Sequence, residues 1–382
     1  MKIAISRAPG AERAVTPLEL FFDLVYVFAI GQLSHHLLEH VDVRTAAETT
    51  VLTLAVVWGW FTTAWGANWL DPDRLPVRLL LVGLAFASLL MSVAIGDAFG
   101  DRAWLFVTGY LLLQIGRSAF LIVALRGRAL GEHFVNTLVW ELLAGVIWVA
   151  GAIAAGDARL ALWAFAVLVT YVGGWNLHWL PGRGRRVDLE HTETAGEHLV
   201  ERLRLFFIIL LGETVLLMGD AFTDAPFELE RLLALAIGFT GTVALWWCYF
   251  QRAEAVGFDA ATTERGAGVV GYWAAWTLTL IVLALIGIAV GDEMAIAHPG
   301  DDAPLGFTLL TFGGPALFLL AQVIFTHEAV GRVPRSRLLA LGALAILALS
   351  TSPLTLIVGI AASTAVLVAV SIADTIGDGG WS

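Results

Sequence analysis

The chain has very little cysteine and little charge. Cys248 is the only cysteine among 382 residues, and Asp, Glu, Lys and Arg together make up 14% of the sequence. A single cysteine excludes an intramolecular disulfide and any metal site built from several cysteines. The low charge excludes an ordinary soluble domain, because a soluble protein has about a quarter of its residues charged. The sequence also lacks a phosphate-binding glycine loop and dinucleotide, serine-hydrolase and haem signatures, so it predicts no cofactor, no enzyme activity and no nucleic-acid partner.

Apolar residues dominate what is present. The hydrophobic fraction is 58%, and the mean hydropathy is +0.81. A helix needs about 20 apolar residues to cross a bilayer, where every backbone amide must be satisfied within the segment. The sequence therefore predicts an all-α polytopic protein in a lipid bilayer. The predicted spans are 18–38, 49–69, 77–96, 104–125, 135–155, 160–180, 199–218, 232–251, 269–290, 305–326, 338–349 and 354–373, of which the eleventh is short.

The basic residues are distributed unevenly between the two sides of the predicted membrane. Seventeen of the 22 Lys and Arg residues fall on the side of the N-terminus, among them Arg202 and Arg337. This bias predicts a protein of the cell inner (plasma) membrane with both termini in the cytoplasm. Fourteen acidic residues, among them Asp292 and Glu293, fall in the opposite loops beside four arginines. These acids either gather cations at the outer face or simply keep the loops soluble.

Matching features in the two halves indicate a tandem duplication. The first predicted span contains Leu-Glu-Leu-Phe-Phe at 18–22, and the seventh contains Leu-Arg-Leu-Phe-Phe at 203–207. The third and ninth spans are both predicted to end at Gly-Asp, at 96–97 and 291–292. We therefore predict a first six-helix repeat at 1–180, a cytoplasmic linker at 181–197 and a second repeat at 198–382. Because six is an even number, the two repeats should be parallel.

Ionisable residues inside predicted spans are the candidate functional residues, because their burial is expensive. Glu19 is the weakest candidate, since Thr16, Pro17 and Glu19 have the spacing of a helix capping box. Asp23 lies one turn deeper and about 10 Å past the cap. A transport role and an ion pair with a neighbouring helix both explain Asp23.

Arg117 and Glu213 are the most informative pair. Each lies nine residues from an arginine that marks the same membrane face, which places both about 13 Å from that face and near the midplane. Equal depth and opposite charge predict that they pair across the two halves. Gln114, one turn from Arg117, extends this network, and Glu141 adds polarity on the cytoplasmic side. A structural lock between the halves explains the same pattern.

A second polar group precedes the seventh span. It contains Glu190, His191, Glu193, Glu197, His198 and Glu201. His198 and Glu201 have a spacing at which they could share a metal, but no further ligand motif accompanies them. We therefore predict no metal site here.

Two runs of sequence resemble a known family. The runs TPLELFFDLVYVFAI at 16–30 and HLVERLRLFFIILLGE at 198–213 resemble the two motifs of the bacterial low temperature requirement A family. That resemblance covers most of the chain. It implies a multi-pass membrane protein, from a family named for a cold-growth phenotype and without a settled biochemical activity.

The first span also has a looser similarity to the endolysosomal potassium/proton channel family. In that family the first helix of each repeat lines the pore, and an isoleucine constricts it. The similarity implies a pore role for Ile30 and places Asp23 in the first-helix motif. The family's Phe-Ser-Asp is Phe-Phe-Asp here, and Ile208 replaces the aspartate in the second half.

Three classes of function follow from these observations. The first is an ion channel or secondary transporter for a monovalent cation or proton, with a path between the halves through Asp23, Ile30, Gln114, Arg117, Glu141 and Glu213. The second is a membrane enzyme acting on a lipid or small amphiphile. The third is a structural or stress-response protein, in which the buried charges neutralise one another. A homodimer is compatible with all three.

Overall fold

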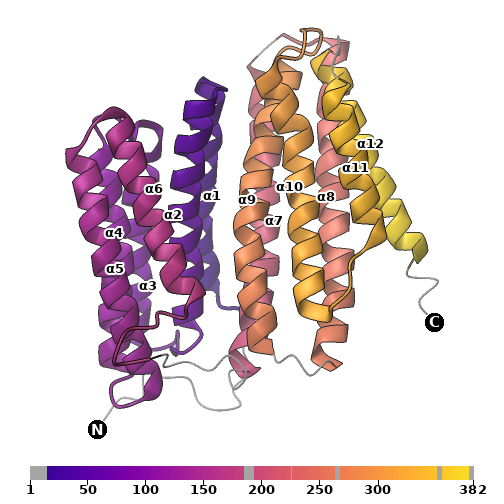
Figure 1. Cartoon of the computed structure of the whole chain (residues 1–382). Helices are drawn as coiled ribbons and strands as arrows, with labels where there is room; N and C mark the ends of the chain where they lie inside the picture. Colours follow the sequence, from indigo (N-terminus) through magenta and orange to yellow (C-terminus); the bar gives the residue numbers. More distant parts are fainter. Residues whose placement is uncertain (1–14, 185–192, 225, 263–266, 351–354, 378–382) are drawn as a thin grey trace. The chain divides into compact units, whose positions relative to one another are not determined.

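The part of the chain that the structure describes folds into twelve α-helices. The computed structural model describes residues 15–184, 193–224, 226–262, 267–350 and 355–377. Figure 1 labels the helices in chain order. They are α1 (Pro17–Glu39), α2 (Val43–Ala67), α3 (Leu75–Ser92), the short 3-10 helix η1 (Ile95–Asp97), α4 (Ala103–Ala124), α5 (Ala129–Ile153), α6 (Gly156–Trp175), α7 (Glu193–Thr223), α8 (Leu229–Thr262), α9 (Ala267–Ala297), α10 (Leu305–Val330), α11 (Arg335–Leu349) and α12 (Leu356–Gly377). The all-α fold class is therefore confirmed.

Proline and glycine set several helix ends. Proline is tolerated at a helix start because the first amide groups have no partner within the helix. Pro304 and Pro334 are the N-cap residues of α10 and α11. At the other end of α10, Gly331 has a φ of 71°, a left-handed conformation in which glycine carries no steric penalty.

Eleven of the described helices are long and apolar enough to cross a membrane. The exception is α11, which has 15 residues. Its length of about 22 Å is shorter than the roughly 30 Å hydrocarbon core. The segments predicted from hydropathy thus correspond to the helices of a polytopic membrane protein, with α11 as the short member.

The helices divide into two compact units. Unit 1 comprises residues 1–36 and 44–202, and unit 2 comprises residues 37–43 and 203–382. The boundary at Arg202 lies inside α7. Residues 185–192 of the predicted linker lie outside the described residues, and α7 already begins at Glu193. The tandem repeat itself stays a prediction.

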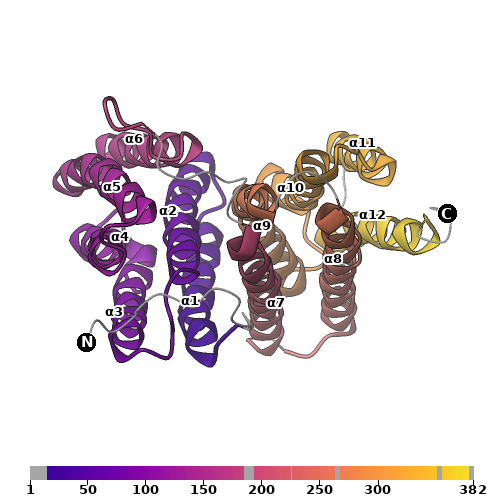
Figure 2. The ribbon, with the colours of Figure 1, turned by 90° about the horizontal axis from the view of Figure 1, so that it is seen from below.

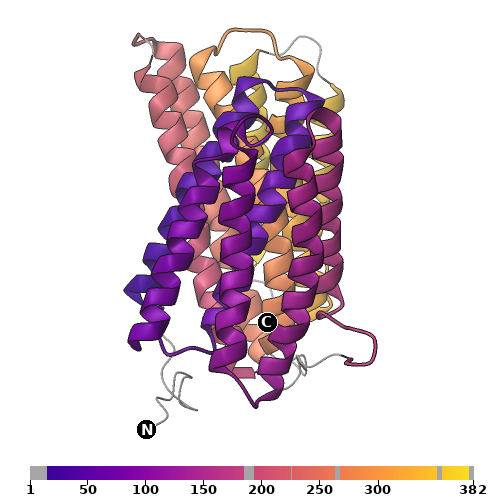
Figure 3. The ribbon, with the colours of Figure 1, turned by 90° about the vertical axis from the view of Figure 1, so that its left-hand side faces the viewer.

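In unit 1, α3, α4, α5 and α6 pack in sequence order, each against the next. Figure 2 views these helices end on, and Figure 3 shows them running lengthwise beside one another. Aromatic rings fill the centre: the ring of Trp148 lies 5.0 Å from that of Tyr110 and 5.2 Å from that of Trp163. Gly109 lets α4 approach α3, since a Cβ there would lie 2.6 Å from the backbone nitrogen of Met91.

In unit 2, α9 packs on α10 and α8 packs on α12. A buried apolar cluster includes Met218, Ile296, Phe307, Leu356 and Ile360. These residues come from α7, α9, α10 and α12, so the cluster ties four helices of the unit together.

Candidate functional site

The start of α1 forms the predicted capping box. The Thr16 backbone amide donates to Glu19 Oε2 at 2.9 Å, and the Glu19 amide donates to Thr16 Oγ1 at 3.4 Å. Glu19 has a second contact, because its Oε1 lies 3.5 Å from Nε2 of His198. The capping residue is thus also part of a buried network in unit 1.

Asp23 is the centre of that network. Its Oδ1 accepts hydrogen bonds from Trp60 Nε1 at 2.7 Å and from Arg202 Nη2 at 2.5 Å. Asp23 and Arg202 are both 0% exposed, and the guanidinium lies 5.6 Å from the centre of the Trp60 ring. The ion-pair interpretation of Asp23 is therefore what the structure shows. The charge count treated Arg202 as one of the basic residues at the membrane face, but its side chain is buried within α7, which begins at Glu193.

His198 extends the network, but it does not share a site with Glu201 as the sequence spacing allowed. Its Nδ1 lies 2.5 Å from Oδ1 of Asn68, and the residue is 1% exposed. Glu201, by contrast, is exposed, so the two side chains do not face a common point. Glu190 and His191 lie outside the described residues. Within the part of the chain that the structure describes, no group of three or more His, Cys, Asp or Glu could hold a metal ion.

A second buried network surrounds Arg117 on α4. Arg117 Nη2 donates to Glu141 Oε1 at 2.5 Å, and Nη1 donates to Gln114 Oε1 at 2.5 Å and to Thr62 Oγ1 at 2.6 Å. Arg117 and Gln114 are each 2% exposed, and Glu141 is 6% exposed. Three helices, α2, α4 and α5, therefore meet at one guanidinium.

Arg117 has a carboxylate partner within unit 1, and its predicted pairing with Glu213 of unit 2 stays a prediction. The ion pair joins Arg117 to Glu141 of the following helix, whereas Glu213 is a buried residue of α7 in unit 2, 8% exposed. Depth along the helix is a poor guide for arginine, whose long side chain reaches residues at other levels. Consecutive helices joined by a short connection are usually neighbours, and this signal favours Glu141.

A small cavity adjoins the Arg117–Glu141 pair on the side of Glu141. Its volume of about 10 Å³ is close to the smallest that holds one water molecule. Glu141 lines this cavity, and its Oε2 forms no hydrogen bond of standard geometry within the described residues, although the Ser118 hydroxyl lies near the carboxylate. The lining residues are Trp58, Tyr110, Leu111, Gln114, Trp140, Glu141, Ala144, Thr170 and His178.

His178 brings a titratable group to this cavity from the segment after α6. Burial lowers the pKa of its imidazole well below the usual range, and nearby His133 and Arg117 lower it further. The rings of His178 and His133 are 5.4 Å apart. Neither histidine was among the candidate residues predicted from the sequence, because neither belongs to a recognisable motif.

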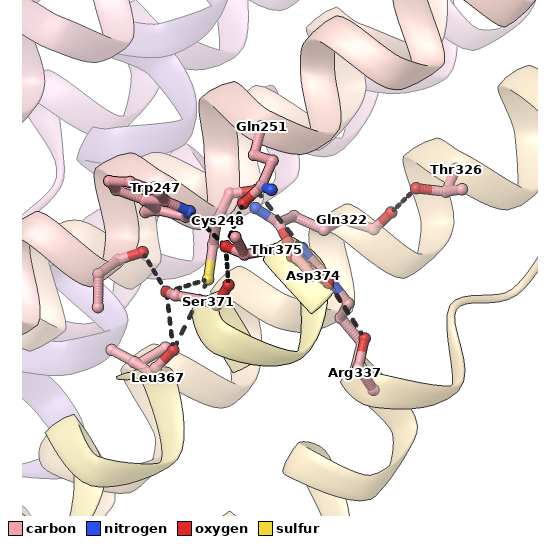
Figure 4. Close-up of polar contacts among 12 residues, drawn as sticks. Trp247, Cys248, Gln251, Gln322, Thr326, Arg337, Leu367, Ser371, Asp374 and Thr375 are labelled. Carbon is pink, nitrogen blue, oxygen red and sulfur yellow. Dashed lines mark hydrogen bonds and ion pairs between the residues drawn. The ribbon is translucent and has the colours of Figure 1, made fainter. Parts of the chain in front are cut away.

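Unit 2 contains its own buried arginine centre, shown in Figure 4. Arg337 of α11 forms an ion pair with Asp374 of α12, and its Nε donates to Gln322 Oε1 of α10 at 3.1 Å. Arg337 is 0% exposed and Asp374 is 7% exposed. The assignment of Arg337 to a loop is wrong. Both residues were missed because each lies one position outside a predicted span, at 338–349 and 354–373.

Two further predicted residues have clear positions. Ile30 is 2% exposed on α1, where it belongs to the core of unit 1. Asp292 was expected in an outer loop, but it lies inside α9, which continues to Ala297, and it is 6% exposed. The expected end of the ninth helix at Gly291 and Asp292 is therefore wrong, since the apolar run after them, at 294–297, continues the helix.

Comparison with known proteins identifies relatives over most of the chain. A family model described as bacterial low temperature requirement A protein (LtrA) matches residues 14–372. An uncharacterized protein of Rhizobium meliloti (strain 1021), RA0937, is 34% identical over 330 residues, which cover 85% of this chain and 80% of the relative. No solved structure matches the chain. Both motifs, at 16–30 and 198–213, lie inside the matched range, and the Asp23–Arg202 ion pair joins them.

Proposed function

Because the chain belongs to the bacterial low temperature requirement A family of multi-pass membrane proteins, we propose that it carries protons across the membrane through a protonatable centre formed by Glu141 and Arg117. The observation that carries the proposal is the buried carboxylate of Glu141 in the wall of a water-sized cavity. Ionisable residues inside a membrane protein commonly form proton relays. Of the transport substrates considered, a proton fits this centre better than a metal cation.

The reason for preferring a proton is the chemistry of the cavity. The Arg117 guanidinium contacts Glu141 and Gln114 of the cavity wall and repels a metal cation, whereas a proton can pass along side chains and a single water molecule. A proton on Glu141 removes the charge that pairs with Arg117. Arg117 then keeps its hydrogen bonds to Gln114 and Thr62. The centre therefore has two arrangements, one with and one without the ion pair, between which a proton gradient can shift the population.

The structural-protein alternative gains support from a different observation. The three buried arginines Arg117, Arg202 and Arg337 each have a carboxylate partner, which is what a purely structural role predicts. At Glu141, however, the carboxylate of such a pair also lines a cavity together with a titratable histidine. A purely structural ion pair does not require a cavity and a titratable histidine beside it.

The test is proton flux into proteoliposomes that contain a pH-sensitive dye. A potassium diffusion potential drives protons inward, and the purified wild-type protein should acidify the lumen faster than empty liposomes do. Glu141→Gln should lose this flux. Glu132→Gln is the matched control, because Glu132 lies on the same helix, is exposed and pairs with Arg183. Wild-type flux equal to that of empty liposomes would rule out the proposal.

We also propose the plasma membrane with both termini in the cytoplasm. Both termini lie on the same side of the membrane only if the number of crossings is even. The short helix α11 must therefore cross together with the eleven longer helices. Cysteine labelling at the two ends of α11, in a Cys248→Ser background, tests this topology. Labels that are accessible from the same side of the membrane would show that α11 does not cross.

A further inference from the structure

The segment after α6 holds His178 in a constrained backbone conformation. Leu177 and His178 both have a φ of 52°, a left-handed conformation that residues other than glycine rarely adopt. The His178 amide donates to the carbonyl of Gly173 at 2.7 Å, and the Leu177 amide donates to that of Gly174 at 2.9 Å. Strained conformations of this kind persist where the surroundings determine them, and they cluster at functional sites.

Two glycines and two tryptophans fix this segment against the cavity. A Cβ at Gly174 would lie 2.0 Å from the Trp58 ring, and a Cβ at Gly173 would lie 2.9 Å from the Trp140 ring. Both indoles line the cavity, and Trp140 Nε1 donates to the carbonyl of Trp179 at 3.1 Å. His178 is thus placed at the cavity wall by packing on both sides.

His133 lies on the other side of His178, towards the membrane face at which α5 begins. It is 6% exposed, and it lies about 12 Å along α5 before Glu141, at 1.5 Å per residue. Nδ1 of His133 and Nδ1 of His178 form no hydrogen bond within the described residues. Two buried histidines therefore lie in succession between the start of α5 and the cavity.

We infer that His178, together with His133, is the route by which protons reach Glu141 from this face of the membrane. The inference rests on the proposed function and names the residues that supply its proton. One ring nitrogen of neutral His178 accepts a proton from the side of His133. The other nitrogen releases its proton, through a water molecule in the cavity, to the Glu141 carboxylate. One proton is transferred, and His178 is left neutral in its other tautomer.

The electrostatic environment suits such a relay. An imidazole passes a proton only if it is neutral at rest, with one nitrogen free to accept and the other able to donate. Burial beside His133 and Arg117 lowers the pKa of His178, which keeps it neutral near pH 7. A buried histidine with a purely structural role needs neither a free nitrogen nor a place at the cavity.

The experiment compares His178→Ala with wild type in the proteoliposome assay, and it uses imidazole as a chemical substitute for the missing side chain. His178→Ala should lose proton flux, and added imidazole should restore it. Liposomes containing Glu141→Gln with the same imidazole measure the leak that imidazole itself causes. His298→Gln is the matched histidine control, because His298 is exposed, and it should keep full flux.

The outcomes separate the inference from the proposed function. Flux in His178→Ala equal to that of wild type, or a loss that imidazole does not restore, overturns the relay while Glu141 keeps its role. Absence of wild-type flux overturns the proposed function instead. If His178→Ala does not yield a monodisperse protein, His133→Gln tests the same route, and wild-type flux in that variant overturns it.

Discussion

Replacing Arg117 by glutamine should destabilise the protein through the loss of one buried ion pair. The change removes the contact to Glu141 and hydrogen bonds to Gln114 and Thr62. The bond to Thr62 joins two helices, and interhelical hydrogen bonds inside membranes contribute only about 0.6 kcal/mol each on average. The bond to Gln114 lies within α4. Leaving a buried charge without its partner costs about 3–5 kcal/mol. The carboxylate of Glu141 therefore determines most of the effect.

A double-mutant cycle isolates the contribution of the Arg117–Glu141 ion pair to the free energy of unfolding. Glu141→Gln alone leaves the guanidinium unpaired and should cost a similar amount, whereas two glutamines can hydrogen-bond to each other. The coupling energy between the two sites should lie near the upper end of the usual range, at about 2–3 kcal/mol. Reversible unfolding in mixed micelles measures the free energy of unfolding of the four proteins.

Two controls accompany this cycle: Glu132 lies on the same helix as Glu141, and Glu213 is the partner that the sequence predicted for Arg117. Glu132→Gln should change the stability by less than about 0.5 kcal/mol, because the Glu132 side chain is 55% exposed. Additive effects of Arg117→Gln and Glu141→Gln, with no coupling, would refute the ion pair as the source of the stability. A coupling of the same size between Arg117 and Glu213 would show that the partner was chosen wrongly.

Three further predictions concern other parts of the chain. Gly109→Ala should destabilise the protein by about 1–3 kcal/mol, because the added methyl group overpacks against α3. Gly83→Ala is the control and should not destabilise it, because nothing lies within 4 Å of a Cβ there. Thermal unfolding in detergent compares the two variants. Asp23→Asn should cost up to about 3–5 kcal/mol, because Arg202 loses its closest carboxylate and keeps only Glu19 at 4.0 Å. Unfolding in mixed micelles measures the change, and a value below about 1 kcal/mol would contradict it. Burial lowers the pKa of His178 in the folded protein, so below about pH 6.5 the unfolded chain binds a proton that the folded protein does not. The free energy of unfolding should therefore decrease as the pH falls, by up to about 1.4 kcal/mol per pH unit. His178→Gln should reduce that slope, and an unchanged slope would contradict the prediction.

Much of the fold could be predicted because burial in a bilayer demands long apolar runs. Every predicted span overlaps a helix, and the capping box at Thr16 and Glu19 was confirmed. The errors lie at helix ends. Asp292 was assigned to a loop because a charged residue followed an apolar run, but α9 continues past it. A buried acid inside a helix looks in the sequence like the end of that helix.

The candidate site could be predicted only in part, for a related reason. Arg117, Gln114, Glu141 and Asp23 were chosen because hydropathy placed them inside spans. The arginines Arg202 and Arg337 were excluded because charge near a span end is usually cytoplasmic. The residues of the buried networks were easier to predict than their ion-pair partners, because the sequence gives the depth of a residue along its helix but not which helices are in contact.

The zero-current voltage of the purified protein in a planar bilayer tests proton transport most directly. The membrane separates solutions with a proton gradient in one direction and a potassium gradient in the other. A proton carrier built on Glu141 should give a voltage that follows the proton gradient, and Glu141→Gln should lose the current. A voltage that follows the potassium gradient, or no conductance above that of a protein-free bilayer, would contradict proton transport by this protein.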